Sequence, residues 1–221
     1  MSIVDLRREG DVFVLTMNAG ENRFNRPFVD AMSAALDEIE GSSGAAALVT
    51  TGGDPKFYSN GLDLSWLSGD GAAEAGTFIA TVLRLLGRVL ALPVPTVAAI
   101  NGHAFAAGGM LALAHDFRVM RADRGFFCLP EIDLGLPLAP GMVALIESRM
   151  APATFRDSIL MGLRIGGADA VARGFADDAV AAEAVLPRAI ERAAALAGKS
   201  REAYGALKRS MYARAIDLLN R

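Results

Sequence analysis

Two loops in the sequence combine glycines with other small residues in a way that suits the stabilisation of a negative charge. They span residues 57–64 and 102–109, and each follows an apolar segment. Free backbone N–H groups at the start of a helix near Gly108 can donate to an oxygen that gains negative charge. Tight backbone packing alone also explains either loop. Together the two loops indicate an oxyanion site.

Glu131 is the candidate for acid/base chemistry. It lies in the segment 126–138, where most neighbouring side chains are apolar. A carboxylate that loses hydration in such surroundings should have a raised pKa, in the range that suits a general base. A solvated glutamate in a surface loop is the alternative that spacing alone leaves open.

The other reactive residue types favour no competing chemistry. His103 and His115 have no acidic or cysteine partner at the spacing of a zinc site, so no metal is expected. No Gly-x-Ser-x-Gly motif is present, and the loop at 102–109 matches neither a dinucleotide fingerprint nor a phosphate-binding loop. Cys128, the single cysteine, is expected to be a buried, unreactive thiol.

Composition favours small-molecule chemistry over binding to nucleic acid or membranes. The 221 residues are 52% hydrophobic and carry a formal net charge of -3, so no cationic excess attracts polyanions. The N-terminus lacks a basic stretch followed by a long apolar one, and no apolar run is long enough to span a bilayer. We therefore expect a cytoplasmic, soluble protein.

The elements that must position these residues alternate between strands and helices. Strands are predicted at 12–17, 45–50, 96–100, 117–120 and 126–128, and helices from Pro27 to about 41, at 78–90 and from near Gly108 to Ala114. Beyond Pro140 the pattern is helical, at about 141–149, 152–162, 167–173, 186–197 and 200–219. We expect one domain, 1–221, with an α/β core over about 1–139 and a helical C-terminal part over about 140–221.

Several motifs in series resemble the crotonase superfamily of enoyl-CoA hydratases and isomerases. They are residues 57–64, 98–109, 115–118 and 130–135, followed by Met161-Gly162 and 168–174. The resemblance implies a spiral of ββα units, trimers that often pair into hexamers, and an acyl-CoA thioester as the ligand. No separate cofactor is implied, because coenzyme A is part of the substrate.

The resemblance also implies roles for particular residues. The N–H groups of Leu62 and Gly108 would form the oxyanion hole for the thioester oxygen, and Glu131 would be the catalytic carboxylate. By the same resemblance, CoA would lie near Arg23, Phe24, Asp63 and Leu64.

Two departures from the family pattern are informative. Family hydratases carry a first glutamate just after the Gly-Gly pair, where this chain is expected to have Leu111, and leucine cannot orient water or transfer a proton. A lone Glu131 resembles the Δ3,Δ2-enoyl-CoA isomerases. A hydratase or another crotonase-type reaction, and a non-catalytic CoA-thioester binder, remain alternatives. The chain is also shorter at its C-terminus than many family members.

Overall fold

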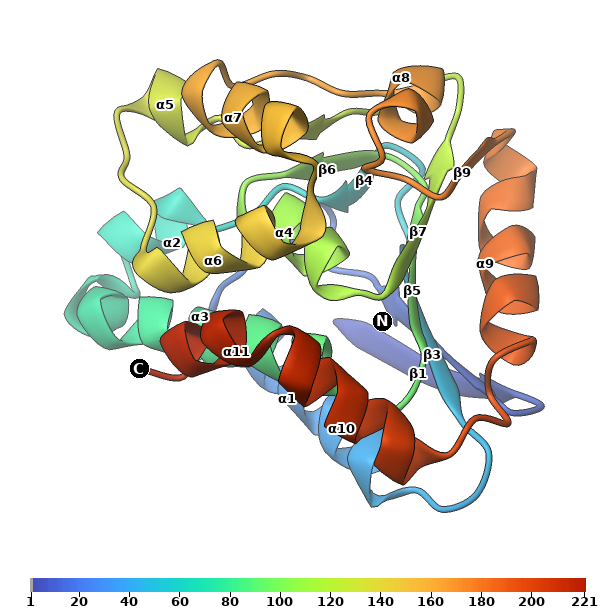
Figure 1. The fold of residues 1–221 in the computed structure, drawn as a ribbon. Helices are drawn as coiled ribbons and strands as arrows, with labels where there is room; N and C mark the ends of the chain where they lie inside the picture. The colour runs from blue at the N-terminus through green and yellow to red at the C-terminus, as the bar shows by residue number, and fades with distance from the viewer. Residues whose placement is uncertain (1) are drawn as a thin grey trace.

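The computed structural model describes residues 2–221, which form two β-sheets surrounded by helices (Figure 1). The larger sheet has six strands in the order β1-β2-β3-β5-β7-β9, and only the β1/β2 pair is antiparallel. Its strands are β1 (Val4–Glu9), β2 (Val12–Met17), β3 (Ala47–Gly52), β5 (Thr96–Ile100), β7 (Phe117–Arg121) and β9 (Asp178–Val180).

A smaller parallel sheet is made of short strands that each follow a strand of the larger one. These are β4 (Phe57–Ser59), β6 (His103–Phe105) and β8 (Phe127–Cys128), paired in that order. The chain thus passes from β3 to β4, from β5 to β6 and from β7 to β8, with helices between the turns. This arrangement is the expected spiral of ββα units.

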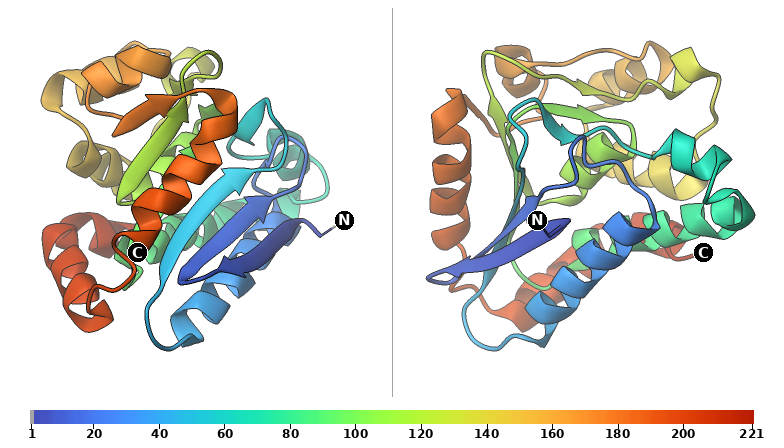
Figure 2. Two further views of the ribbon diagram at one scale, coloured as in Figure 1. Left: turned by 90° about the vertical axis from the view of Figure 1, so that its right-hand side faces the viewer. Right: turned by 180° about the vertical axis from the view of Figure 1, so that it is seen from behind.

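Both faces of the large sheet are buried, because its strands alternate between two hydrophobic clusters. Val12 and Val14 pack with α9 (Val185–Ala194), whereas Phe13 and Leu15 pack with the opposite cluster, which includes α1 (Arg26–Gly41) and α3 (Ala75–Ala91). Figure 2 shows α9 alone on one side of the sheet. Burial on both faces explains why the parallel strands are apolar at nearly every position.

The remaining helices lie around the smaller sheet and beside β7 and β9 at the edge of the larger one. They are α2 (Leu64–Ser68), α4 (Ala107–Ala114), α5 (Glu131–Leu134), α6 (Pro140–Arg149), α7 (Pro152–Leu160) and α8 (Gly167–Ala172), with 3-10 turns at Ala72–Glu74 and Ala182–Ala184. The C-terminal helices α10 (Arg201–Met211) and α11 (Ala213–Leu219) return to pack on α3 and α6.

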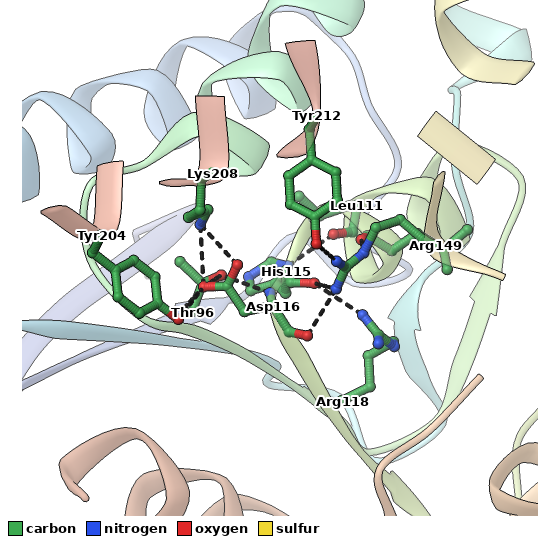
Figure 3. Close-up of polar contacts among 10 residues, drawn as sticks. Thr96, Leu111, His115, Asp116, Arg118, Arg149, Tyr204, Lys208 and Tyr212 are labelled. Carbon is green, nitrogen blue, oxygen red and sulfur yellow. Dashed lines mark hydrogen bonds and ion pairs between the residues drawn. The ribbon is translucent and has the colours of Figure 1, made fainter. Parts of the chain in front are cut away.

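A polar cluster joins the C-terminal helices to the core (Figure 3). The Asp116 carboxylate, at the start of β7, accepts hydrogen bonds from the Thr96 backbone and hydroxyl at 2.9 and 3.0 Å. Two residues of α10 also contact this carboxylate. The Tyr204 hydroxyl donates to it at 3.2 Å, and Lys208 Nζ forms an ion pair with it at 3.0 Å. Arg149 links α6 to the same region by donating to the His115 and Asp116 carbonyls at 2.7 Å.

The predicted elements are confirmed where the apolar pattern is long, and the short strand predicted at 126–128 is present as β8, while several other short elements were not predicted. The strands at 12–17 and 96–100 have the predicted bounds, and the helical C-terminal part is present. Unpredicted elements are β1, β4, β6, β9, α2 and α5. Of these, β9 pairs with β7, and α9 packs on β5, so part of the C-terminal region completes the sheet.

Candidate active site

A cavity of about 410 Å³ opens between the smaller sheet and the helices around it. It collects side chains from α2, α3, α4, α5 and α6 and from the loops that precede them. Most of the lining is apolar, and its polar side chains are Arg23, Asn60 and Glu131. The complete lining is Arg23, Asn60, Leu62, Leu64, Leu67, Ile79, Phe105, Ala106, Ala107, Met110, Pro130, Glu131, Leu134, Leu136, Pro137, Leu138, Ala139 and Met142.

Glu131 is the only acidic residue in this lining. It begins α5, a single helical turn that Pro130 precedes and that Gly135 ends in a left-handed conformation with φ of 66°. Its Oε2 atom is buried and has no hydrogen-bond partner among residues 2–221. Burial raises the pKa of the carboxyl, and a hydrogen bond from its own backbone offsets this only in part. The solvated-loop alternative is therefore wrong, and the group suits a general base.

The first small-residue loop places Leu62 in the cavity lining. The groups on either side of it are engaged, because Phe24 donates to the Gly61 carbonyl at 2.7 Å and Asp63 donates to the Phe24 carbonyl at 3.0 Å. The N–H of Leu62 has no acceptor within residues 2–221. Gly61 has φ of +77°, and a Cβ there would lie 2.8 Å from Ala106, so only glycine allows the loops to approach this closely.

The second loop leads into the start of α4, which points its first turn at the cavity. Ala106, the residue before the helix, has φ of 50° and ψ of -126°, a strained conformation for a residue other than glycine, at a cost of about 1–3 kcal/mol. Strain of this kind is typical of functional sites. Ala106 and Ala107 line the cavity, and the N–H groups of the first helical turn have no partner within the helix.

Gly108 lies one residue further into α4 and does not line the cavity. A Cβ on Gly108 would lie 2.4 Å from the Ser59 carbonyl oxygen, so glycine at this position allows α4 to pack against the first loop. The need for glycine thus comes from contact between the two loops.

A buried chain of hydrogen bonds joins the first loop, through β3, to the C-terminal half of α4. Thr50 Oγ1 lies 2.7 Å from the Tyr58 hydroxyl and 2.9 Å from His115 Nε2, and His115 Nδ1 lies 2.8 Å from the Leu111 carbonyl. Burial lowers the pKa of His115 to about 4, so the ring is neutral at pH 7. Nδ1–H then donates to Leu111, Nε2 accepts from Thr50, and Thr50 accepts from Tyr58.

Met110, and not Leu111, occupies the wall where the sequence analysis expected an apolar replacement for a carboxylate. Leu111 is fully buried in the core, whereas Met110 lines the cavity. Each residue of a helix turns the side chain by about 100°, so an error of one position moves a side chain from cavity to core. The wall is apolar as predicted, but Met110 forms it and Leu111 does not.

Comparison with known proteins agrees with this geometry. The sequence model of the enoyl-CoA hydratase/isomerase family matches residues 7–221. The chain belongs to that family. It is 35% identical over 225 residues to enoyl-CoA delta isomerase 3 of Arabidopsis thaliana, covering 96% of this chain and 94% of that protein. The protein is thus an enzyme of the crotonase superfamily, as the resemblance implied.

Solved structures of the family share the fold along nearly the whole chain. An enoyl-CoA isomerase of Mycobacterium tuberculosis has a TM-score of 0.89 and 27% identity, covering 99% of this chain and 94% of that one. An enoyl-CoA hydratase of Mycobacterium ulcerans has a TM-score of 0.90 and 27% identity, covering 98% and 94%. The spiral fold with a helical C-terminal part is therefore confirmed. Both names occur among these structures, and the M. tuberculosis protein is called an isomerase in one structure and a probable hydratase in another.

Of the four residues that the family resemblance assigned to CoA, the structure brings two to the cavity. Arg23 and Leu64 line it, and Glu21 Oε2 accepts from Arg23 Nε at 2.7 Å and from Asn60 Nδ2 at 3.0 Å. Phe24 is fully buried against Phe28. Asp63 caps α2 by accepting from the Trp66 amide at 3.0 Å. The side chains of Phe24 and Asp63 thus have structural contacts away from the lining.

The remaining candidates lie outside the cavity. His103 packs among Phe57, Phe105 and Phe126, and burial lowers its pKa. Cys128 is buried, donates to the Gly162 carbonyl at 3.3 Å and has a raised pKa because of burial, which keeps it a thiol.

Within residues 2–221, no group of three or more His, Cys, Asp or Glu side chains is arranged to hold a metal ion. No helix there is long and apolar enough to cross a bilayer.

Met110 and Met142 line the cavity although the sequence did not single them out, and Asn60 and Ala107 line it as members of the two small-residue loops. Helical periodicity from Ala107 would have indicated Met110, but Asn60 and Met142 depend on how distant elements meet.

Proposed function

We propose that the protein is a Δ3,Δ2-enoyl-CoA isomerase that uses Glu131 as its single acid/base. The observation that carries this proposal is the composition of the cavity lining, where Glu131 is the one acidic side chain and the facing wall of α4 is apolar at Met110. A single base can serve two carbons of a substrate, whereas positioning a water for hydration needs a further polar partner.

In this reaction the Glu131 carboxylate removes a proton from C2 of a 3-enoyl-CoA. The electrons form a dienolate with negative charge on the thioester oxygen. Glu131, now protonated, returns the proton to C4, and the double bond moves to C2–C3. The unpaired, buried Oε2 atom supports this role, because a carboxyl shielded from water keeps the proton until it is redelivered.

The thioester oxygen would accept hydrogen bonds from the N–H of Leu62 and from the first turn of α4. The structure leads us to name Ala107 as the donor in α4 in place of the predicted Gly108, because Ala107 lines the cavity. Two preorganised donors of this kind each contribute about 3 kcal/mol of transition-state stabilisation. The strained backbone at Ala106 supports the proposal, since it sets the direction of this helix start.

The CoA portion would approach along Arg23 and Leu64. The guanidinium of Arg23, held by Glu21, suits the phosphate groups of CoA, and Leu64 is an exposed apolar residue at the same rim. CoA then enters as part of the substrate, with no separate cofactor. The trimeric or hexameric assembly and the cytoplasmic location expected from the sequence remain predictions.

Hydration is the second candidate, since a relative of the same fold is named an enoyl-CoA hydratase. A direct comparison of rates separates the two. Wild-type protein should convert 3-hexenoyl-CoA to the conjugated 2-enoyl product, followed by absorbance, much faster than it hydrates 2-hexenoyl-CoA. Hydration as fast as isomerisation would replace the isomerase proposal with the hydratase.

A pair of adjacent variants tests the reason for this preference. Met110→Glu places a second carboxylate in the cavity and should introduce hydration of 2-hexenoyl-CoA, because water then has a second polar partner. Leu111→Glu is the matched variant, and it should instead destabilise the fold by burying a carboxyl in the core. Hydration gained by the folded Leu111→Glu variant and not by Met110→Glu would contradict the placement of this wall.

A further inference from the structure

The first small-residue loop is held in place by an earlier segment of the chain, residues 19–25. The Asn60 amide donates to the Glu21 carbonyl at 2.9 Å, and Leu62 forms a parallel bridge with Phe24. Because the loop takes these backbone contacts from a distant segment, the position of the Leu62 N–H is set from outside its own loop.

Asn22 lies at the centre of this contact and is fully buried. Its backbone has φ of 51°, in the left-handed region, which asparagine adopts more readily than most residues. Its side-chain Nδ2 donates to the Tyr58 carbonyl at 3.0 Å, and its Oδ1 accepts from the Ala19 amide at 2.9 Å. The Asn22 carbonyl accepts from the Ser59 hydroxyl at 2.7 Å. A buried residue whose polar groups are paired in this way favours one arrangement of the segments that it joins.

Ser59, the partner of Asn22, lies where the two small-residue loops meet. Its hydroxyl oxygen also accepts from the Gly61 N–H at 3.3 Å. A Cβ on Gly108 would lie 2.6 Å from the same oxygen, so Ser59 packs directly against the first turn of α4. Contacts from Asn22 thus extend through Ser59 to the residue before Leu62 and to the start of α4.

We propose that Asn22 is a positioning residue for the oxyanion hole. This inference rests on the proposed isomerase function. Asn22 does not line the cavity, and it acts through the first loop, whose position against α4 sets the spacing of the Leu62 and Ala107 N–H groups. Negative charge develops on the thioester oxygen only as the proton leaves C2, so a displaced donor weakens the transition state more than the bound substrate. The loss should appear in kcat, with little change in KM.

Two substitutions remove the side-chain contacts of Asn22 in different ways. Asn22→Gly deletes the amide and leaves a residue that adopts a positive φ freely. Asn22→Asp keeps the size of the side chain and the acceptor for Ala19, but it turns a carboxylate oxygen, in place of a donor, toward the Tyr58 carbonyl. Both variants should lower kcat with 3-hexenoyl-CoA by at least about tenfold, less than the roughly hundredfold or greater loss that follows removal of a whole oxyanion donor. Their KM should stay within a few-fold of wild type.

Asn101→Ala is the matched control for a general loss of stability. The Asn101 side chain bonds to the connection between β3 and β4, with both the N–H and the carbonyl of Gly52 at 3.0 Å and with the Asp54 carbonyl at 2.7 Å. Asn101 lies outside the cavity lining. Its removal should lower the free energy of unfolding, while the folded variant keeps the kcat of wild type.

A second measurement reads the oxyanion site without turnover. 3-Ketohexanoyl-CoA has no double bond to move, and loss of a C2 proton converts it to an enolate that absorbs in the near ultraviolet. Wild-type protein, in excess over this compound, should raise the enolate fraction above that in buffer at the same pH, because preorganised N–H groups stabilise the charge. Both Asn22 variants should lose this enrichment, and Asn101→Ala should keep it.

The remaining outcomes separate this inference from the proposed function. Wild-type protein that does not isomerise 3-hexenoyl-CoA removes the isomerase function, yet an enolate enrichment that depends on Asn22 would still support the positioning role. Losses of kcat in Asn22→Gly that equal those in Asn101→Ala at equal stability would show that Asn22 only stabilises the fold. A raised KM with unchanged kcat would also overturn the inference, because the effect would then lie on substrate binding.

Discussion

Two carboxylates of this protein lie in opposite environments. Asp116 accepts hydrogen bonds from Thr96, Tyr204 and Lys208, so its charge is matched by donors and by a cation (Figure 3). Glu131 has an Oε2 atom with no donor and a raised pKa caused by burial. Both side chains are largely shielded from water, yet only the Asp116 carboxylate has several hydrogen-bond donors and a cation beside it.

The difference separates a carboxylate that stabilises the fold from one that suits catalysis. The donors around Asp116 contact its carboxylate and join α10 to the start of β7. The Oε2 atom of Glu131 has no such donor, and its lone pairs remain available to a proton from the substrate. An unpaired buried carboxylate costs stability, and natural proteins retain one where function requires it.

The largest expected effect is on activity at Glu131. Glu131→Gln keeps the size of the side chain and removes the base, so isomerisation should fall by at least about a hundredfold, the usual scale for a general base. Binding of a CoA thioester, measured by calorimetry, should remain. Glu147→Gln, on the exposed surface of α6, is the control. Activity of Glu131→Gln within a few-fold of wild type would show that another group is the base.

The corresponding change in the paired cluster should affect stability instead. Lys208→Met leaves Asp116 without its cation and should lower the free energy of unfolding by about 3 kcal/mol, at the low end for a broken buried pair because the other donors remain. Chemical denaturation measures this change, with the exposed neighbour Arg209→Met as control. Loss of turnover in folded Lys208→Met, without loss of stability, would contradict a purely structural cluster.

The pH dependence of activity should reflect the raised pKa of Glu131. Isomerisation needs the charged form, so kcat/KM should fall on acidification with a midpoint above 4.5, the ordinary pKa of glutamate.

Because the folded-state pKa of Glu131 is raised, the native protein binds more protons than the unfolded chain, and stability falls as pH rises from about 4.5 through the folded-state pKa. Unfolding of wild type and Glu131→Gln across this range should therefore diverge with rising pH. Parallel curves would contradict the raised pKa.

The smallest effect concerns the hydrogen-bond chain that joins Tyr58 in the first loop to α4. Thr50→Val leaves the Tyr58 hydroxyl and His115 Nε2 without their shared partner, so stability should fall by about 1–3 kcal/mol and kcat should fall a few-fold with little change in KM. Thr51→Val is the matched control, because it removes a hydroxyl that donates only to the Ala99 carbonyl, at 3.1 Å. Equal kcat in both variants would show that these hydrogen bonds do not help to position the first loop against α4.

Much of this fold and the identity of Glu131 follow from the sequence by itself. Long apolar runs predict the parallel strands because burial on both faces requires them, and the bounds of β2 and β5 agree with the structure. Glu131 became a candidate because its neighbours are apolar, and the resemblance to the crotonase superfamily implied its catalytic role. Its burial and raised pKa agree with that interpretation.

Only the tertiary structure decided which neighbouring side chains face the cavity. Strands β4 and β6 have three residues each, too few for a pattern, and they are stable only because they pair with each other. The start of α4 at Ala107 decides that Met110 faces the cavity and Leu111 the core, since one residue turns a helix by about 100°. The pairing of Asp116 with Lys208 joins residues 92 positions apart, a contact that local sequence cannot encode because it arises when α10 packs on the core.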